Sequence, residues 1–377
     1  MTELDLRSLV ADPATKVVVT CGSGGVGKTT TAAALAVAAA DAGRKVAVLT
    51  IDPARRLAQS LGLQELDNTP RRVDIDTAGE LWAMMLDTRR TFDEMVLAHS
   101  TTERAEKIFA NPFYRTISTS FSGTQEYMAM EKLGTLAATG EYDLIVVDTP
   151  PSRSALDFLD APQRLSSFLD GRMIRLLLTP GRGVMKLVGA GFALFARAVR
   201  TVIGGQMLTD ATQFVQLFED LFGGFRERAE ATQRLLRRPG TAFVVVAICE
   251  AEAIREASYF ADRLRADRMP LAGVVLNRTH PLLAELAGLS PAAVDAAARK
   301  IADSDPLTAG VLAVHSRRLA IHSEEKRMLA RVTGAHPDMP IRQIPALATD
   351  VHDVEGLRAL CKQMGGDQPA VAAVESC

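Results

Sequence analysis

One eight-residue segment near the N-terminus limits the fold of this chain more than any other feature. Residues 22–29 read Gly-Ser-Gly-Gly-Val-Gly-Lys-Thr. Glycines allow backbone N–H groups to turn inward around phosphate oxygens, where a Cβ atom would clash. An apolar, β-branched run (Val17–Thr20) precedes the segment, and an alanine-rich helical stretch (Thr29–Ala42) follows it. A glycine-rich loop between a strand and a helix predicts a phosphate-binding P-loop.

The residues of this loop differ in the chemistry that they bring to a nucleotide. Lys28 supplies a point charge for the β- and γ-phosphates, and Thr29 supplies a hydroxyl for Mg²⁺. The first N–H groups of the following helix favour an anion. A glycine-rich turn without a ligand is the alternative, and the flanking strand and helix argue against it. The predicted nucleotide-binding residues here are Gly22, Ser23, Gly24, Gly25, Val26, Gly27, Lys28, Thr29 and Thr30.

Short apolar runs alternate with longer helical segments along most of the chain. Runs without polar alternation, separated by helices, predict a parallel sheet that is covered on both faces. The predicted fold class is α/β, a doubly wound and mostly parallel sheet of the P-loop type with an α-helical insertion. Strands are expected at Val17–Thr20, Lys45–Ile51, Leu81–Leu86, Leu144–Val147, Ala242–Ile248, Leu271–Leu276 and Pro340–Ile344.

A long stretch without a strand pattern, Ser154 to Arg238, interrupts this alternation. We expect residues 1–153 and 239–365 to form the two parts of the P-loop core, and residues 154–238 to form a helical subdomain that binds a client or partner. Residues 366–377 are expected to be a flexible tail. The P-loop pattern is not repeated, which predicts one nucleotide site.

Two aspartates follow predicted strands at the end of the sheet where ligands bind in such folds. Asp148 follows Leu144–Val147 and is expected to hold Mg²⁺ through its water shell, together with Thr29. Asp52 ends the strand over Lys45–Ile51 and is expected to orient or deprotonate the attacking water. Asp52, Lys28 and Asp148 are therefore the predicted catalytic residues; a capping or turn role is the alternative for each aspartate.

Asn277 follows the strand at Leu271–Leu276 and is expected to hydrogen-bond the edge of the base. A guanine site would usually have an aspartate two residues further along, and this chain has Thr279 there. This pattern favours ATP over GTP.

The net charge and the distribution of apolar residues indicate which kinds of partner and which cell compartment to expect. A net charge of −2 argues against a general nucleic-acid-binding surface. Met1–Lys16 has acidic residues and no apolar core of a signal peptide, and no run is long enough to span a bilayer. We therefore expect a cytoplasmic protein. The four cysteines and six histidines show no zinc-ligand spacing, so no zinc is expected.

The stretch Arg172–Leu208 carries only positive formal charges among many apolar side chains. On one helix these residues would form a basic amphipathic face that could lie on an anionic membrane or cover an apolar client. An ordinary helix that packs into the core is the alternative, and both interpretations stay open.

These pieces together resemble the arsenical pump-driving and tail-anchored-protein-targeting ATPases of the ArsA type, in particular an actinobacterial anion-transporting-ATPase-like branch. The resemblance covers most of the chain. It is carried by the loop at Gly24–Thr30, Asp52-Pro53-Ala54, Asp148-Thr149-Pro150-Pro151, Glu250 with Arg255-Glu256, Asn277, and Pro345 with Asp350-Val351.

The resemblance implies a homodimer or pseudo-dimer with two facing ATP sites, closed by ATP and opened by hydrolysis. That movement would shift a helical, client-binding subdomain. Asp52 would position the lytic water, Asp148 would couple loss of the γ-phosphate to the helical region, and Pro345 would pack on the adenine.

Three departures from the family's pattern change this expectation. Ser23 stands where the family has a lysine that reaches across the dimer to the partner's phosphates, which should weaken catalysis at the partner's site. The family's zinc and arsenite cysteines are missing. Arg55, Arg56 and Arg153 stand where the family commonly has other residues. Two interpretations stay open for each of them: it restores positive charge near the phosphates, or it is an ordinary solvated arginine.

We therefore expect one half of an asymmetric dimer, paired with a paralogous ATPase that keeps the lysine, and acting on a hydrophobic client or a membrane partner. A weakly hydrolysing ATP-binding regulatory or scaffold subunit is the main alternative. A small-molecule kinase on the same scaffold is a third, and it would need a polar acceptor pocket where this chain is apolar.

Overall fold

A computed structural model describes residues 3–52, 56–112, 114, 124–150, 205–282 and 288–365 of the chain. It divides into two compact units. The first, here the core unit, comprises Met1–Met84, Glu141–Arg153 and Leu236–Cys377; the second, here the helical unit, comprises Met85–Gly140 and Ser154–Leu235. Residues 85–140 are expected from the sequence to belong to the core, whereas the structure groups them with Ser154–Leu235.

Eight strands form one sheet in the described part of the chain, in the order β3-β4-β2-β5-β1-β6-β7-β8. Neighbours from β2 to β8 for which a register is resolved run parallel, while β3 is antiparallel to β4. The predicted mostly parallel, doubly wound sheet is confirmed. The strands are β1 (Val17–Cys21), β2 (Lys45–Thr50), β3 (Arg71–Arg72), β4 (Glu80–Met85), β5 (Leu144–Asp148), β6 (Thr241–Ile248), β7 (Leu271–Thr279) and β8 (Ile341–Pro345).

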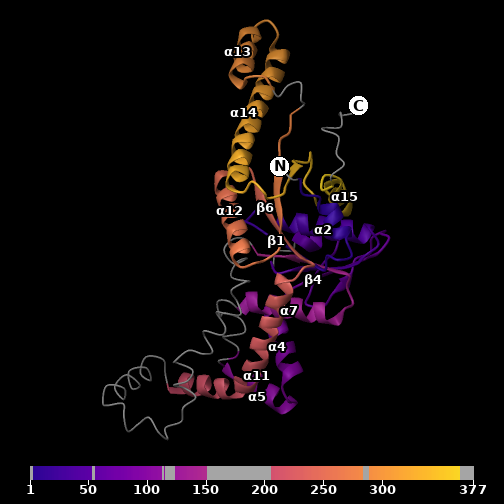
Figure 1. Ribbon diagram of the computed structural model, residues 1–377, viewed down its shortest axis with the longest axis vertical. Helices are drawn as coiled ribbons and strands as arrows, with labels where there is room; N and C mark the ends of the chain where they lie inside the picture. Colours follow the sequence, from indigo (N-terminus) through magenta and orange to yellow (C-terminus); the bar gives the residue numbers. More distant parts are fainter. Residues whose placement is uncertain are drawn as a thin grey trace, which may run out of the picture. The chain divides into compact units, whose positions relative to one another are not determined.

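The helices of the core unit cover both faces of this sheet (Figure 1). The crossover from β1 to β2 moves one way along the sheet, and the crossover from β6 to β7 moves the other way. Because both crossovers of such parallel strands are right-handed, their helices lie on opposite faces. One layer holds α2 (Lys28–Asp41), packed on α1 (Leu6–Ala11) and α15 (Val354–Lys362), and the other holds α12 (Ala251–Ala266).

The strand order reverses direction beside β1, and this sets where a ligand can bind. Between β1 and its neighbours, the connecting helices leave for opposite faces, so a crevice opens beyond the carboxyl ends of the strands. The interiors of β1 and β5 are buried at every position. The carboxyl end of β1 continues directly into the predicted P-loop.

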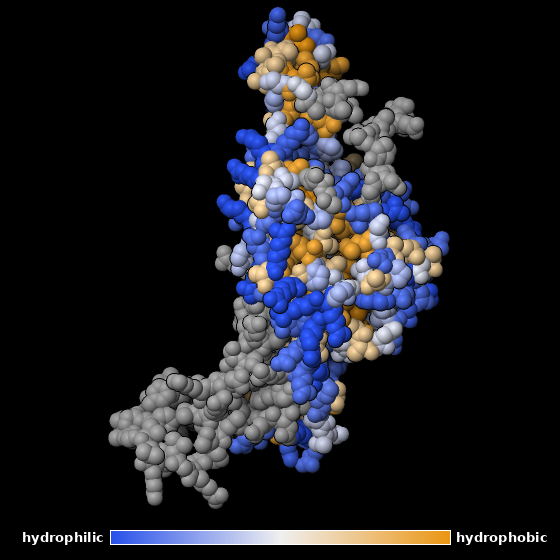
Figure 2. Space-filling model, viewed as in Figure 1, coloured by the Kyte–Doolittle hydropathy of each residue, from blue (hydrophilic) through white to orange (hydrophobic). Residues whose placement is uncertain are grey.

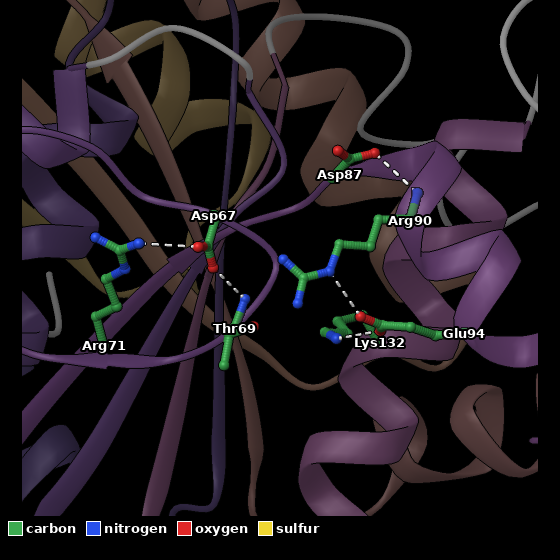
Figure 3. A network of polar contacts seen from close by, with 7 residues as sticks. All are labelled: Asp67, Thr69, Arg71, Asp87, Arg90, Glu94 and Lys132. Atoms are coloured by element: carbon green, nitrogen blue, oxygen red, sulfur yellow. Dashed lines mark hydrogen bonds and ion pairs between the residues drawn. The ribbon is translucent and has the colours of Figure 1, made fainter.

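Strand β3 was not predicted from the sequence. It has two residues, Arg71 and Arg72, both exposed, so it lacks an apolar pattern. A short turn precedes it, in which the carboxylate of Asp67 accepts from the backbone N–H of Thr69 at 2.7 Å and from the Arg71 guanidinium at 3.0 Å (Figure 3). Only pairing with β4 makes this segment a strand.

Two further helices of the core unit, α13 (Pro291–Ile301) and α14 (Pro306–Ala335), form a hairpin after β7. A single-turn helix, α3 (Arg56–Ser60), follows β2.

The helical unit is built from α4 (Thr88–His99), α5 (Thr102–Ala110), α7 (Thr124–Thr139) and α11 (Gly205–Arg237). Asp87 caps α4 by accepting from the N–H of Arg90 at 2.9 Å, and Glu94 on the same helix pairs with Lys132 of α7 at 3.0 Å (Figure 3). Within the described chain, no helix is both long and apolar enough to cross a membrane.

Aromatic rings form the centre of the helical unit. The rings of Phe92 and Tyr114 stack with centroids 5.3 Å apart. The ring of Phe214 lies 6.4 Å from that of Tyr114, and the ring of Phe225 lies 6.2 Å from that of Phe92. Of the basic apolar stretch Arg172–Leu208, residues 172–204 lie outside the described residues, as does the predicted tail 366–377. The described α11 lies where the sequence pattern predicts no strand.

Candidate nucleotide site

The loop between β1 and α2 depends on glycine at two positions where another residue would not fit. Gly22 has a φ of +147°, and a Cβ atom there would lie 2.1 Å from the carbonyl oxygen of Val246 in β6. Gly27 has a φ of +97°, and its Cβ would lie 2.3 Å from Nδ2 of Asn277. The loop therefore packs closely against β6 and against the end of β7, and these contacts fix its position at the carboxyl ends of the strands.

Lys28, the first residue of α2, is buried behind the loop. Its Nζ donates to the carbonyl oxygen of Ser23 at 2.7 Å. Burial lowers the pKa of Lys28, and the nearby carboxylate of Asp148 partly raises it again. The lysine charge is thus held at the loop by a neutral acceptor rather than by an ion pair.

Asp148, at the end of β5, is completely buried beside this lysine. Its Oδ2 accepts from the hydroxyl of Thr50 at 2.9 Å, whereas its Oδ1 has no hydrogen-bond partner among the described residues. Burial raises the pKa of Asp148 from 3.8 to about 6, although the hydroxyls of Thr29 and Thr50 and the charge of Lys28 lower it. The structure therefore keeps an unused carboxylate oxygen next to the P-loop.

A pocket of about 1110 Å³ opens beside the loop in the core unit. It brings together Asp52, Asn277 and Pro345, which are far apart in the sequence. Its lining includes these predicted site residues: Gly24, Gly25, Gly27, Lys28, Thr29, Thr30, Asp52, Asn277 and Pro345.

Four predicted residues do not line this pocket. Gly22, Val26 and Asp148 are buried behind its wall, and the side chain of Ser23 is half-buried. Gly22 and Val26 are predicted to act through their backbone N–H groups, and that prediction does not need their side chains to face the pocket.

Several lining residues were not predicted. Arg278 has a left-handed backbone with a φ of +56°, which is rare for a residue other than glycine. Arg56 lines the pocket, as one of the hypotheses for the unusual arginines requires; Arg55 and Arg153 lie outside the described residues. The remaining lining is formed by Ala346, Leu347, Thr349 and Leu360, together with Asp350 and Val351 of the motif that carries the family resemblance.

Asn277 holds the P-loop in place. Its Nδ2 donates to the carbonyl oxygen of Val26 at 2.9 Å, and its Oδ1 accepts from the N–H of Arg278 at 3.0 Å. The side chain is buried. The prediction that Asn277 reads the edge of the base stays untested, and its observed contacts give it a positioning role for the loop.

The residues present fit a magnesium nucleotide. An orphaned buried carboxylate oxygen beside a P-loop threonine suits a cation with an oxygen shell. Because the loop residues that line the pocket include glycines, no Cβ atom blocks access to their backbone N–H groups. The same pocket contains the buried Lys28. No cluster of three or more His, Cys, Asp or Glu side chains that could hold a metal occurs in the described residues.

Comparison with known proteins decides the family. A family profile described as anion-transporting ATPase matches residues 15–287, more than half of the chain. This chain belongs to the anion-transporting ATPase family. The match spans β1 with its P-loop and β7 with Asn277, whereas the part of the pocket lining from Pro345 to Leu360 lies beyond it.

Curated relatives agree with this assignment at low identity. The chain is 26% identical over 273 residues to the ATPase GET3 of Malassezia globosa, covering 72% of this chain and 75% of the relative. It is 26% identical to the ATPase ARSA2 of Chlamydomonas reinhardtii, covering 74% and 72%, and 25% identical to an ATPase ASNA1 homologue of Babesia bovis, covering 74% and 70%. The chain is thus an ATPase of this family, and the resemblance inferred from its motifs is confirmed.

Proposed function

We propose that this anion-transporting ATPase family member hydrolyses MgATP at the P-loop of its core unit. One observation carries the proposal most directly: Asp148, fully buried beside Lys28 and Thr29, keeps Oδ1 without a partner. Native proteins satisfy most buried polar atoms, so such an exception needs a reason. A cation with a water shell, held by Thr29 and Asp148, would supply that partner and neutralise charge on the β- and γ-phosphates.

Each side chain around the pocket then has its own proposed role in binding or hydrolysing ATP. Lys28 now donates to the Ser23 carbonyl and would, with ATP bound, give its charge to oxygens of the β- and γ-phosphates instead. Asp52 lines the same pocket and is proposed to orient the attacking water and accept its proton. Pro345 is proposed to pack on the adenine, and Asn277 keeps the loop in register through Val26.

We further propose that the chain works as one subunit of an asymmetric dimer. Ser23 lies in the P-loop where the resembling family has a lysine that serves the opposite site. Its hydroxyl carries no charge, and its carbonyl already accepts from Lys28. A paralogue that retains the lysine would complete this chain's site, while this chain gives no charge in return. ATP-driven closure and hydrolysis-driven opening would then move the helical unit, which captures or releases a hydrophobic client or energises a membrane partner.

Steady-state turnover and nucleotide binding test the catalytic part. Asp52→Asn and Asp148→Asn should each lower turnover by at least about 100-fold, while Asp52→Asn keeps ATP binding within a few-fold. Asp74→Asn, on an exposed loop of the core unit, is the matched control and should keep wild-type turnover. Equal turnover of wild type and Asp148→Asn with Mg²⁺ would overturn the assignment.

A pull-down with Asp52→Asn under MgATP tests the partner part. A paralogous ATPase and proteins with an apolar terminal helix are the expected recoveries, and adding that paralogue should raise turnover of the wild-type chain. If turnover is the same with and without the paralogue, the asymmetric dimer is wrong. If ATP binds normally but is not turned over in either case, the chain is a regulatory subunit.

A further inference from the structure

The end of β7 has one residue more than the strand beside it. Asn277 pairs with Ile344 of β8, and Thr279 pairs with Pro345, so two residues of β7 lie opposite one step of β8. Arg278 is the extra residue of this β-bulge, and it has a φ of +56°. Asn277 and Thr279 are buried, whereas Arg278 is exposed and lines the nucleotide pocket. Bulges next to ligand sites commonly re-aim one side chain in this way.

An arginine is a costly residue for this backbone conformation. With φ near +56°, the Cβ atom comes close to the following carbonyl oxygen, so glycine or asparagine usually occupies such a position. Outliers of this kind persist only where the surrounding structure fixes them, and they occur often at functional sites. The backbone alone therefore favours glycine at position 278, and the arginine side chain needs a separate explanation.

Hydrogen bonds on both sides hold Arg278 in this conformation. Its backbone N–H donates to Oδ1 of Asn277 at 3.0 Å, and the carbonyl oxygen of Thr279 accepts from the N–H of Ala346 at 2.9 Å. Asn277 is itself fixed to the P-loop through the carbonyl oxygen of Val26. The position of Arg278 is thus set by the P-loop on one side and by the end of β8 on the other.

Helix α14 holds the next part of this segment, His280, at three atoms. Glu325 accepts from the His280 backbone N–H at 2.9 Å and lies 2.7 Å from its Nδ1, while Nδ1 of His322 lies 3.2 Å from its carbonyl oxygen. Glu325 is buried. The first turn of α14 differs, because Leu307 is exposed and apolar side chains gather over the end of the α13–α14 hairpin, at the top of Figure 2. The segment after Arg278 is therefore anchored to the packed half of α14.

The guanidinium of Arg278, in contrast to its backbone, is not engaged. It forms no hydrogen bond or ion pair with any residue that the structure describes. An arginine can bind oxyanions through its fork of N–H groups, or lie flat on an aromatic ring. The two ends of the pocket decide between these two kinds of partner.

The phosphates and the base of a bound nucleotide would lie at different ends of this pocket. Lys28 and the P-loop form one end, where the proposed function places the β- and γ-phosphates. β7 is the second strand from β1 and β8 is the third, about 10 and 14 Å away at the usual strand spacing. Arg278 therefore lies at the base end. The apolar lining there is formed by Pro345, Ala346, Leu347, Val351 and Leu360.

We propose that the guanidinium of Arg278 stacks on the purine ring of the bound nucleotide. This inference rests on the proposed ATPase function, since it needs a nucleotide in the pocket. No aromatic side chain is among the described residues that line the pocket, so the guanidinium supplies the planar group that a base prefers as its neighbour. Every purine offers such a face, so Arg278 adds affinity for the base without choosing between adenine and guanine.

Calorimetric titration of the full chain with two ligands tests the proposal. The ligands are a non-hydrolysable ATP analogue and inorganic tripolyphosphate, which has three phosphates and no base, both with Mg²⁺. Arg278→Lys keeps the charge but loses the plane, so it should weaken binding of the analogue by about 10-fold. It should leave tripolyphosphate binding unchanged.

A pair of glycine variants separates binding from folding. Arg268, which follows α12, is also an exposed arginine with a left-handed φ, of +57°, but it does not line the pocket. Arg278→Gly and Arg268→Gly should both unfold at the wild-type urea concentration or above it, since glycine adopts this conformation without strain. Only Arg278→Gly should weaken binding of the ATP analogue.

The possible failures are distinguishable. A wild type that binds neither ligand would overturn the proposed ATPase site and this inference with it. If the wild type binds both ligands and the two Arg278 variants bind the analogue as tightly, only the role of Arg278 is wrong. Equal weakening of both ligands would show that the guanidinium contacts the phosphates, and it would contradict stacking on the base.

Discussion

Two buried carboxylates, one in each unit, are treated in opposite ways by this fold. In the helical unit, Glu131 of α7 is paired: its Oε1 accepts from Arg228 at 2.7 Å, and its Oε2 lies 3.5 Å from the Tyr127 hydroxyl, which donates to the Phe225 carbonyl oxygen at 2.9 Å. In the core unit, Asp148 uses Oδ2 for Thr50 and leaves Oδ1 without a described partner. A satisfied buried carboxylate holds helices together, whereas an unsatisfied one costs stability and keeps binding capacity for a ligand.

The largest expected effect tests whether the site of the core unit depends on close backbone packing. Gly22→Ala places a Cβ against the Val246 carbonyl and should displace the loop, lowering ATPase activity by at least about 100-fold. Gly43→Ala has a similarly positive φ of +88° but meets no atom within 4 Å. It should cost only about 1 kcal/mol of folding stability and keep activity. Turnover and urea unfolding of both variants check this; equal activity would contradict the packing argument.

The next effect tests whether the Glu131–Arg228 pair stabilises the helical unit. Glu131→Gln removes the charge opposite a half-buried guanidinium and should lower the free energy of unfolding by about 2–3 kcal/mol. Glu103→Gln breaks the exposed Lys107 pair and serves as the control, with an expected change below about 0.5 kcal/mol. Urea denaturation measures both. Similar losses for the two variants would mean that burial of the Glu131 pair adds nothing.

Removing the charge of Asp148 should raise the free energy of unfolding, whereas removing the charge of Glu131 should lower it. Since the folded chain binds a proton here more tightly than the unfolded chain, with a pKa of about 6 against 3.8, wild-type stability should fall as pH rises through this range. Without Mg²⁺ and nucleotide, Asp148→Asn should therefore be more stable than wild type at pH 8 by on the order of 2 kcal/mol. The difference should disappear near pH 4. Unfolding curves at both pH values decide it; a destabilised variant at pH 8 would break the comparison between the two carboxylates.

The smallest effect concerns Asn277. Asn277→Ala removes one hydrogen bond to the Val26 carbonyl, worth about 1 kcal/mol, so KM for ATP should rise about fivefold. If Asn277 acts through the loop, the substitution should weaken the binding of ATP and of GTP equally. Fluorescence titration with both nucleotides separates the roles, because selective loss of ATP binding would instead show that the side chain reads the base.

Much of the core unit could be predicted because its signals are local. The P-loop needs glycines, a lysine and a threonine in a fixed order, and β1, β5 and β6 are buried on both faces, so each is an unbroken apolar run. The aspartate at the end of such a run must lie at the ligand end of a parallel sheet. Asp148 and Asp52 do lie beside the P-loop, as their order in the sequence indicates, while their catalytic roles stay predictions.

Features that depend on a distant partner could not be predicted. β3 is a strand only because β4 pairs with it. Trp82 in β4 is half-buried, and the Lys45 ammonium nitrogen lies 5.6 Å from the centroid of its ring. Amphipathic helices such as α4 and α5 give the same pattern whichever unit they join, so the sequence does not show that Met85–Gly140 belongs to the helical unit.

The sequence by itself therefore determined the P-loop, the parallel sheet and the positions of the two aspartates, because these rest on spacing and on strand burial along one segment. Only the tertiary structure decided that Asn277 holds the loop, that Oδ1 of Asp148 stays unsatisfied, and that Arg278 takes a left-handed conformation at the pocket. Each of these depends on which atoms lie across a contact between segments far apart in the chain, and a linear pattern carries no record of that.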